Sequence, residues 1–416
     1  MECNVKSLLS VCKNLATAIL ENGGETYRAE ECIIRLCNRF GFDDVDVMAF
    51  PTGVVISVKD ENKNCYSETC RVKRRSFDLR RLNSANEISR RVIDGEISLF
   101  EAEKIFCVSE SGSDKNFLKW INIMAGGLSS GFFAVLFGGK IVDFFAALIC
   151  GLAIQLFLLF FKKIDAANFI SNFVGSALAS VIAVMLILLY PSLNLSLVII
   201  GAIMPLLPGL PMTNAIRDTI NGDLISGISR IGEVLLVAVC LAAGAGFVLS
   251  GYYSFGGTFS TNVADFGFVL ESVHALAFCF LATLFFSLLL SAPSKSLIPS
   301  AIIAAIGYYV FFVFDYFGLS IMLGGFIGTL FIAMVGELLA RIYKMPATIF
   351  VFPAVIPLVP GIWLYETMLY LVQGDYSSFA TKGTETVFFA GVMAGAIALT
   401  NFIFRAFAKK NKKTNI

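Results

Sequence analysis

The sequence is poor in charged residues, carries almost no net charge and contains a single histidine. Only 15% of its 416 residues are charged and 57% are hydrophobic, whereas soluble domains usually contain about 25% charged and about 45–50% apolar residues. This composition does not fit a water-soluble protein. The net charge of +1 excludes a disordered chain, which needs low hydrophobicity and high net charge. It also argues against a nucleic-acid-binding domain, which is usually basic.

The motifs of metal binding and ATP hydrolysis are missing as well. The ten cysteines include no Cys-x-x-Cys pair, and beside a lone histidine they make no zinc-site pattern. Seven of them precede residue 110, in a segment expected in the cytosol, where thiols stay reduced. No P-loop sequence occurs, so nothing indicates an ATP-driven pump. We therefore expect neither a cofactor nor a metal site.

The charges that are present divide the chain into two parts. Residues 1–119 contain 18 Lys and Arg and 19 Asp and Glu, which leaves 14 and 12 for residues 120–416. This distribution is typical of a small charged domain followed by a membrane domain. Over residues 1–115 we expect a cytosolic α+β domain. Its predicted helices are 7–21, 25–40, 78–93 and 98–108, and its predicted strands are 46–50, 54–59 and 65–73.

Ten apolar runs in the second part approach the roughly 20 residues that a transmembrane helix needs. With the N-terminus in the cytoplasm, twelve Lys and Arg fall on the inside and only two, Lys140 and Lys382, on the outside. The positive-inside rule then favours ten spans in the cell (plasma) membrane, with both termini cytoplasmic. The runs lie near residues 120–139, 141–161, 166–190, 195–210, 231–250, 266–291, 297–314, 316–340, 346–372 and 386–408.

Two segments of the membrane part resemble each other at an offset of 152 residues. MPLLPGLPMTNAIRDTINGD (204–223) and IPLVPGIWLYETMLYLVQGD (356–375) share Pro-x-x-Pro-Gly and a Gly-Asp pair further along. Residues 116–252 and 253–416 are therefore predicted to be two halves of five helices each, and the odd number inverts the second half. The predicted fold is an α-helical integral membrane protein with ten transmembrane helices in a 5+5 inverted repeat. Secondary transporters commonly have this arrangement, with the substrate site at the repeat interface.

The prolines of the repeated motif should interrupt both helices, because proline removes a backbone donor and clashes with the preceding turn. Interrupted backbone is tolerated at membrane depth only where it is buried in protein or lines a cavity. A half-helix that begins after each motif glycine would offer free N–H groups to a carboxylate; a kink that only shapes packing is the alternative. The substrate-binding candidates are Pro205, Pro208, Gly209, Thr213, Asn214, Pro357, Pro360, Gly361, Tyr365 and Glu366.

Ionisable residues in or near apolar spans are candidates for proton coupling or gating, since such groups are costly in a membrane and usually face a partner or a pathway. Glu271 and His274 share a helix face, so both a proton relay and a structural hydrogen bond are open. Helix anchoring at an interface is the alternative for Glu233 and Glu385, and a solvated loop is the alternative for Asp218. The full set is Asp218, Arg230, Glu233, Glu271, His274 and Glu385.

Several motifs carry a resemblance to a known family. GETYRAE (24–30) with FPTG (50–53), and ISLFEA (97–102), resemble the first part of the threonine/serine exporter family, while TNAIRD (213–218) and GISR (227–230) resemble its membrane motif. The resemblance covers nearly the whole chain, with both halves in one polypeptide. It implies amino-acid efflux driven by the proton gradient through ten membrane helices, and some relatives are associated with dicarboxylate export instead.

Three classes of function follow. The leading hypothesis is proton-coupled secondary export of threonine and serine by antiport, with a succinate-like dicarboxylate as the alternative substrate. The expected partners are the small amino acid or carboxylate, protons and the lipid bilayer, without nucleic acid, and a homo-oligomer stays open. A membrane-bound hydrolase that uses the N-terminal domain and a structural or sensory membrane protein are the other two classes. The sequence favours a transporter and not an enzyme.

Overall fold

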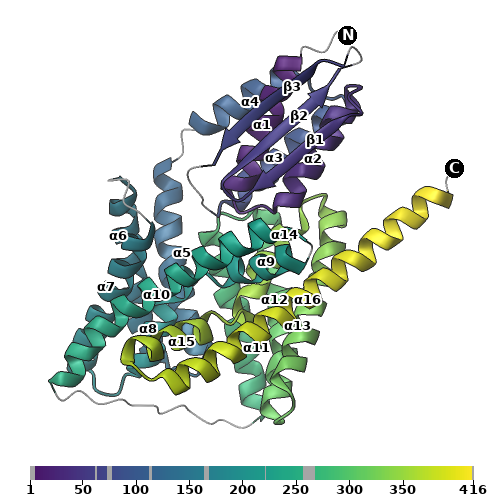
Figure 1. Ribbon diagram of the computed structural model, residues 1–416. Helices are drawn as coiled ribbons and strands as arrows, with labels where there is room; N and C mark the ends of the chain where they lie inside the picture. Colours follow the sequence, from purple (N-terminus) through teal and green to yellow (C-terminus); the bar gives the residue numbers. More distant parts are fainter. Residues whose placement is uncertain are drawn as a thin grey trace. The chain divides into compact units, whose positions relative to one another are not determined.

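The computed structural model describes residues 5–60, 63–72, 77–111, 115–163, 168–220, 222–255 and 268–414 (Figure 1). The chain divides into two compact units. The first comprises Met1–Lys119 with the short segments Leu290–Ser294 and Tyr343–Ile349. The second comprises Trp120–Leu289, Lys295–Ile342 and Phe350–Ile416.

The first part of the chain has the small α+β fold that the periodicity predicts. A helical pair is followed by a three-stranded sheet and then by two more helices (Figure 1). Each predicted helix and strand is present, with its ends shifted by a few residues at most. In chain order the elements are α1 (Val5–Glu21), α2 (Thr26–Arg39), β1 (Val45–Phe50), β2 (Gly53–Lys59), β3 (Cys65–Arg71), α3 (Leu79–Ile93) and α4 (Leu99–Ser111).

The sheet is an antiparallel meander in the order β1-β2-β3. Alternate residues of β2, namely Val54, Ile56 and Val58, are buried, because α1 packs on β2 and β3. At the β1–β2 turn, a side chain on Gly53 would place its Cβ 2.5 Å from the carbonyl oxygen of Cys70. Glycine is therefore required at that position for β3 to pair with β2.

The rest of the chain is helical, and one order of elements occurs twice: three long helices, a short helix that ends in a 3-10 turn, a second short helix and a long helix. The first series is α5 (Lys115–Leu136), α6 (Ile141–Lys163), α7 (Asn168–Leu189), α8 (Leu195–Ile203), η1 (Met204–Leu206), α9 (Gly209–Ile220) and α10 (Leu224–Ser254). The second is α11 (Phe268–Leu289), α12 (Ser294–Tyr316), α13 (Ile321–Tyr343), α14 (Ala347–Val355), η2 (Ile356–Leu358), α15 (Gly361–Gln373) and α16 (Tyr376–Thr414).

Seven helices of the described chain are long and apolar enough to cross a membrane, so this is a multi-pass membrane protein. They are α6, α7, α10, α11, α12, α13 and α16. An eighth span is formed if the bent pair Ala347–Leu358 and Gly361–Leu371, which meet at 49°, crosses as one. Two of the ten predicted runs are not among these spans. The fourth, Leu195–Leu206, is too short because the chain leaves the helix before Pro208, and the first, α5, contains polar residues such as Lys119 in its N-terminal part.

Two helices begin earlier than predicted. Arg230 and Lys382 were expected in connections between spans, but they lie within α10 and α16. A Gly-Asp pair stands directly before each of these helix starts, and its glycine, Gly222 or Gly374, has a φ of +97° or +79°. Left-handed backbone of this kind ends a helix. Each long helix starts directly after the aspartate of its pair.

Helices α7 and α10 approach each other closely in the second unit. The Ser176 hydroxyl donates a hydrogen bond to the carbonyl of Leu241. A Cβ atom on Gly244 would collide with the carbonyl oxygen of Phe173. Small residues permit backbones to approach in this way in membranes, where apolar burial does not drive helices together.

We predict that Gly244→Ala lowers the midpoint of thermal unfolding of the purified protein in detergent. The new methyl group meets a backbone carbonyl that cannot move without shifting α7, and overpacking of this kind costs about 1–3 kcal/mol. The matched control is Gly251→Ala in the same helix, since no atom lies within 4 Å of its Cβ position. Equal midpoints for the two variants would show that α7 and α10 do not pack this closely.

Candidate functional site

Both copies of the repeated motif interrupt their helices, as predicted, and do so in the same way. α8 runs into η1 and α14 runs into η2, each 3-10 turn with a proline among its first two residues. The next residues, Leu207 and Val359, are extended, with φ/ψ of −65°/132° and −61°/134°. Each precedes a proline, Pro208 or Pro360, which disfavours helical backbone at the residue before it.

The two motifs also share three backbone hydrogen bonds at the offset of 152 residues. In each motif, the amide of the residue before the second proline donates to the carbonyl of the first residue of the 3-10 turn. The amide of the fourth residue of the half-helix donates to the carbonyl of that proline, and the amide of the aspartate in the Gly-Asp pair donates to a carbonyl of the half-helix. Local structure therefore repeats along with the sequence. The matched pairs are Leu207 N–Met204 O (3.2 Å) with Val359 N–Ile356 O (3.1 Å), Met212 N–Pro208 O (3.1 Å) with Leu364 N–Pro360 O (2.9 Å), and Asp223 N–Asp218 O (2.9 Å) with Asp375 N–Tyr370 O (3.0 Å).

The two breaks contact each other. The Leu207 side chain lies 3.3 Å from the Cβ position of Gly361, the first residue of α15, and both residues are buried. Around this contact, α9 packs on α16 and α15 packs on α10 (Figure 1). Each half-helix thus contacts the long helix that closes the other series of elements.

A second contact supports each 3-10 turn from the third helix of its own series. The Cδ1 atom of Leu206 lies 3.5 Å from the Cβ position of Gly175 in α7, and the Cδ1 atom of Leu358 lies 3.4 Å from that of Gly328 in α13. The leucines are 152 residues apart and the glycines 153. The same side-chain packing therefore occurs at both breaks.

The substrate-binding candidates lie on the two half-helices and on the turns before them. In the first motif Pro208 and Asn214 are buried, Pro205 is half-buried, and Gly209 is the first residue of α9; the side chain of Thr213 lies outside the described part of the structure. In the second motif the structure buries Pro357, Pro360, Gly361 and Tyr365 and leaves Glu366 half-buried.

A buried ion pair joins α9 to α10. The carboxylate of Asp218 lies 3.3 Å from Nε of Arg230, and the two side chains are 2% and 12% exposed. Asp218 is therefore a buried residue of a helix and not part of a solvated loop. Such a pair holds the far end of the first half-helix, because leaving either charge alone in this environment is strongly unfavourable.

The matching position in the second series holds Lys382, which has different partners. Its Nζ lies 3.2 Å from the carboxylate of Glu385 and 5.7 Å from the ring centre of Trp363, the third residue of α15. The carboxyl group of Glu366 interacts electrostatically with both Lys382 and Glu385. Glu366 therefore lies within electrostatic range of the Lys382–Glu385 pair.

Of the remaining candidates, Glu233 lies three residues after Arg230 in α10, and the other two lie in α11. Glu271 and His274 are half-buried in α11 and interact with each other electrostatically, in agreement with their predicted common face. The His274 ring packs on Phe278, with ring centres 4.5 Å apart. Glu233 is half-buried in α10.

Sequence reasoning missed three residues of this site. Leu207 and Trp363 read as ordinary apolar residues, and only their long-range contacts distinguish them. Lys382 had a signal, because the offset of 152 residues pairs it with Arg230. Within the described residues, no three His, Cys, Asp or Glu side chains come together as a metal site would require.

Comparisons with known proteins agree over most of the chain. Residues 10–252 match the ThrE family model of threonine/serine exporters, and residues 275–403 match a second model, described as "Threonine/Serine exporter, ThrE". The "Threonine/serine exporter" of Corynebacterium glutamicum is 22% identical over 441 positions, which cover 98% of this chain and 87% of that protein. No solved structure matches the chain.

Two other relatives match shorter parts. The "Probable succinate transporter subunit YjjP" of Klebsiella aerogenes is 23% identical over 243 residues, which cover 57% of this chain and 91% of that protein. An "Uncharacterized protein" of Haemophilus influenzae is 26% identical over 145 residues, or 33% of this chain. The chain covers about half, 49%, of that relative's length.

We predict that Asp218→Asn strongly destabilises the protein in detergent, since removing one partner of a buried ion pair costs about 3–5 kcal/mol. Combining it with Arg230→Gln should recover part of that loss, because no uncompensated charge then remains. The control is Glu31→Gln, which removes an exposed ion pair with Arg35 and should change the midpoint of thermal unfolding little. Additive losses in the double variant would contradict a direct pair.

Proposed function

Because this chain belongs to the threonine/serine exporter family, we propose that it is a secondary active exporter of small amino acids, with threonine and serine as its substrates. The observation that supports this most directly is the contact between the two interrupted helices, at Leu207 and Gly361. Discontinuous helices that meet inside a membrane are the usual setting of transporter sites.

The half-helices suit the carboxylate of an amino acid. α9 and α15 begin directly after their breaks, and the first N–H groups of a helix have no partner within it. Together with the positive end of the helix dipole, these groups favour an anion. We propose that Pro205, Pro208, Pro357 and Pro360 form the breaks that free such groups, and that Gly209 and Gly361 begin the half-helices there, with the N–H of Gly361 donating to the carbonyl of Val359 at 2.7 Å. We propose that the side chains of Thr213, Asn214, Tyr365 and Glu366 hydrogen-bond the rest of the substrate.

We further propose that the membrane part has ten spans in two inverted halves of five, residues 116–252 and 253–416. In this arrangement α5 forms the first span and α8 with α9 the fourth. The matched hydrogen bonds and the repeated packing of Leu206 and Leu358 support this view. The excess of Lys and Arg on one side supports a cytoplasmic location for both termini and for the N-terminal domain, residues 1–115.

Proton-coupled antiport is the proposed energy source, since the chain has no ATP-binding motif and several ionisable residues lie in its apolar helices. Asp218 and Arg230 would act as a gate, because their ion pair must break for α9 to move away from α10. Proton coupling then rests on carboxylates and the histidine, for which the candidates are Glu233, Glu271, His274 and Glu385.

Export of a dicarboxylate such as succinate is the second candidate. The similarity to the YjjP protein over 57% of the chain favours it, and a dicarboxylate would also fit the helix N-termini. Because the family is one of exporters, we propose no catalytic role for the N-terminal domain.

The purified protein in proteoliposomes is expected to move threonine and serine, and to do so faster when a pH gradient is imposed. Succinate run in parallel distinguishes the two substrate classes. Liposomes without protein and a proton-conducting ionophore are the controls. Transport of succinate alone would replace the amino-acid assignment, and no movement of any of the three would contradict the exporter.

Gly361→Val is expected to reduce threonine transport at least tenfold while the protein still inserts into membranes. The new Cβ would lie 3.3 Å from Leu207, and the additional methyl groups would fill the contact between the breaks. The matched control is Gly391→Val in α16, where no atom lies within 4 Å of the Cβ position. Transport at the wild-type rate by Gly361→Val would disprove a site at the breaks.

A further inference from the structure

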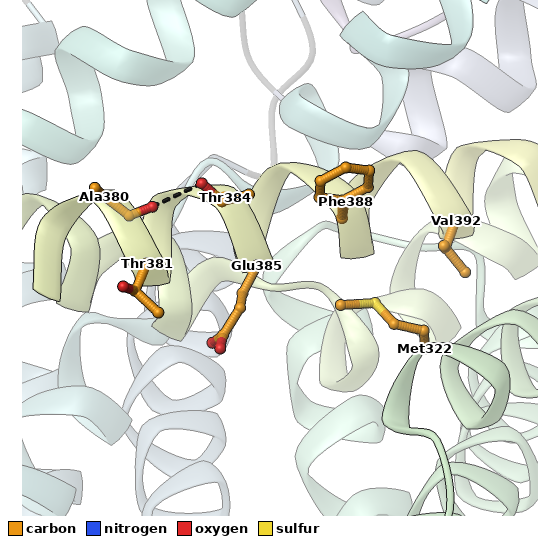
Figure 2. Close-up of a pocket in the computed structure, with 7 residues that line it drawn as sticks. All are labelled: Met322, Ala380, Thr381, Thr384, Glu385, Phe388 and Val392. Atoms are coloured by element: carbon orange, nitrogen blue, oxygen red, sulfur yellow. Dashed lines mark hydrogen bonds between the residues drawn. The ribbon is translucent and has the colours of Figure 1, made fainter.

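A hollow of about 570 Å³ lies between the start of α13 and the first half of α16 (Figure 2). This volume is within the range of small-molecule sites, about 300–1,000 Å³. The lining residues of α16 recur at helical spacing and so lie along one face of that helix. The lining consists of Met322 from α13 and Ala380, Thr381, Thr384, Glu385, Phe388 and Val392 from α16.

The polar part of the lining accepts hydrogen bonds. The hydroxyl of Thr384 donates to the carbonyl of Ala380 at 2.7 Å, and that of Thr381 donates to the carbonyl of Ser377 at 3.1 Å. A hydroxyl that has used its proton can still accept through its oxygen. Figure 2 shows the Thr381 and Glu385 side chains on the same side of α16, where Met322 also lies. A ligand there meets acceptors and therefore needs several donors.

The charges beside the hollow favour a cation. Glu385 is the charged residue of the lining, and its carboxylate lies 3.2 Å from the ammonium group of Lys382. The Lys382 and Glu385 side chains are 35% and 45% exposed. Exposed pairs of this kind contribute little stability, so another ammonium group can displace Lys382 from Glu385 at low cost.

Lys382 would keep a partner after such an exchange. Its ammonium group already lies over the Trp363 ring, where a cation is attracted by the ring face, and the carboxyl group of Glu366 lies within electrostatic range. Trp363 belongs to the first turn of α15. The charge released from Glu385 therefore stays next to the half-helix that begins at the break.

We propose that this hollow is a binding site for the primary ammonium group of the transported amino acid. Glu385 pairs with the ammonium group in place of Lys382, Thr381 and Thr384 accept its remaining N–H bonds, and Phe388 and Met322 contact the substrate's carbon atoms. This site rests on the proposed function and adds the substrate's positive end to it. A dicarboxylate, which has no ammonium group, gains nothing from the hollow.

Two probes separate the ends of the substrate: ethanolamine, which has an ammonium group but no carboxylate, and N-acetylthreonine, which has a carboxylate but no ammonium group. In scanning fluorimetry of the purified full-length protein, ethanolamine should raise the unfolding midpoint of the wild type and leave that of Glu385→Gln unchanged. Any shift caused by N-acetylthreonine should be the same in both proteins.

In proteoliposomes, Glu385→Gln should raise the KM for threonine about tenfold or more, as expected for a lost charge-assisted hydrogen bond. Thr384→Val should raise the KM less than Glu385→Gln does. Lys382→Gln should lower the KM, because Lys382 then no longer competes with the substrate's ammonium group for Glu385. Opposite effects of neighbouring substitutions would not arise from misfolding. The control is Glu31→Gln, which removes an exposed ion pair with Arg35 and should leave the KM unchanged.

The outcomes distinguish this site from the proposed function. If the wild type transports threonine, and Glu385→Gln has a KM within twofold of it and the same response to ethanolamine, the ammonium site is wrong and the exporter stands. If the wild type transports no amino acid but its response to ethanolamine requires Glu385, the site stands and the proposed substrate is wrong. A wild type that neither transports threonine nor responds to ethanolamine contradicts both.

Discussion

The structure depends on how two interrupted helices satisfy their backbones within an apolar protein. A break exposes N–H and C=O groups, and a bilayer offers no water to bond them. Here the breaks are buried in protein and lie against each other, with Leu207 on Gly361. A leucine of each 3-10 turn also packs against a glycine of a neighbouring helix, at Gly175 and Gly328. The proline-glycine motif thus contacts the helices around it as well as its own.

The scarce charges of the membrane part lie beside these half-helices. Arg230 and Lys382 occupy matching positions, yet Arg230 is in a buried pair with Asp218 while Lys382 is in a half-exposed group with Glu366, Glu385 and Trp363. The position matching Asp218 is Tyr370, which cannot form the same pair. Similar backbones therefore carry different electrostatics at the two breaks.

This asymmetry fits the chemistry of a zwitterionic substrate. The half-helix N-termini offer partial positive charge to a carboxylate, and the hollow beside Glu385 offers acceptors to an ammonium group. Two perfectly equal halves would present the same groups twice and would not distinguish the two ends of an amino acid. On the proposed function, the sequence differences within the repeat are thus the source of substrate preference.

Much of this could be read from the sequence, because it follows from local rules. Proline interrupts a helix, glycine permits left-handed backbone, and apolar periodicity marks strands and helices, so the α+β domain, both breaks and the offset of 152 residues were predictable. The burial of Asp218, the early starts of α10 and α16, and the contacts of Leu207 and Trp363 were not. These features depend on residues that are far apart in the chain, whereas propensity and spacing describe only residues close together in it. The side chain that contacts a break is determined when the helices pack against each other.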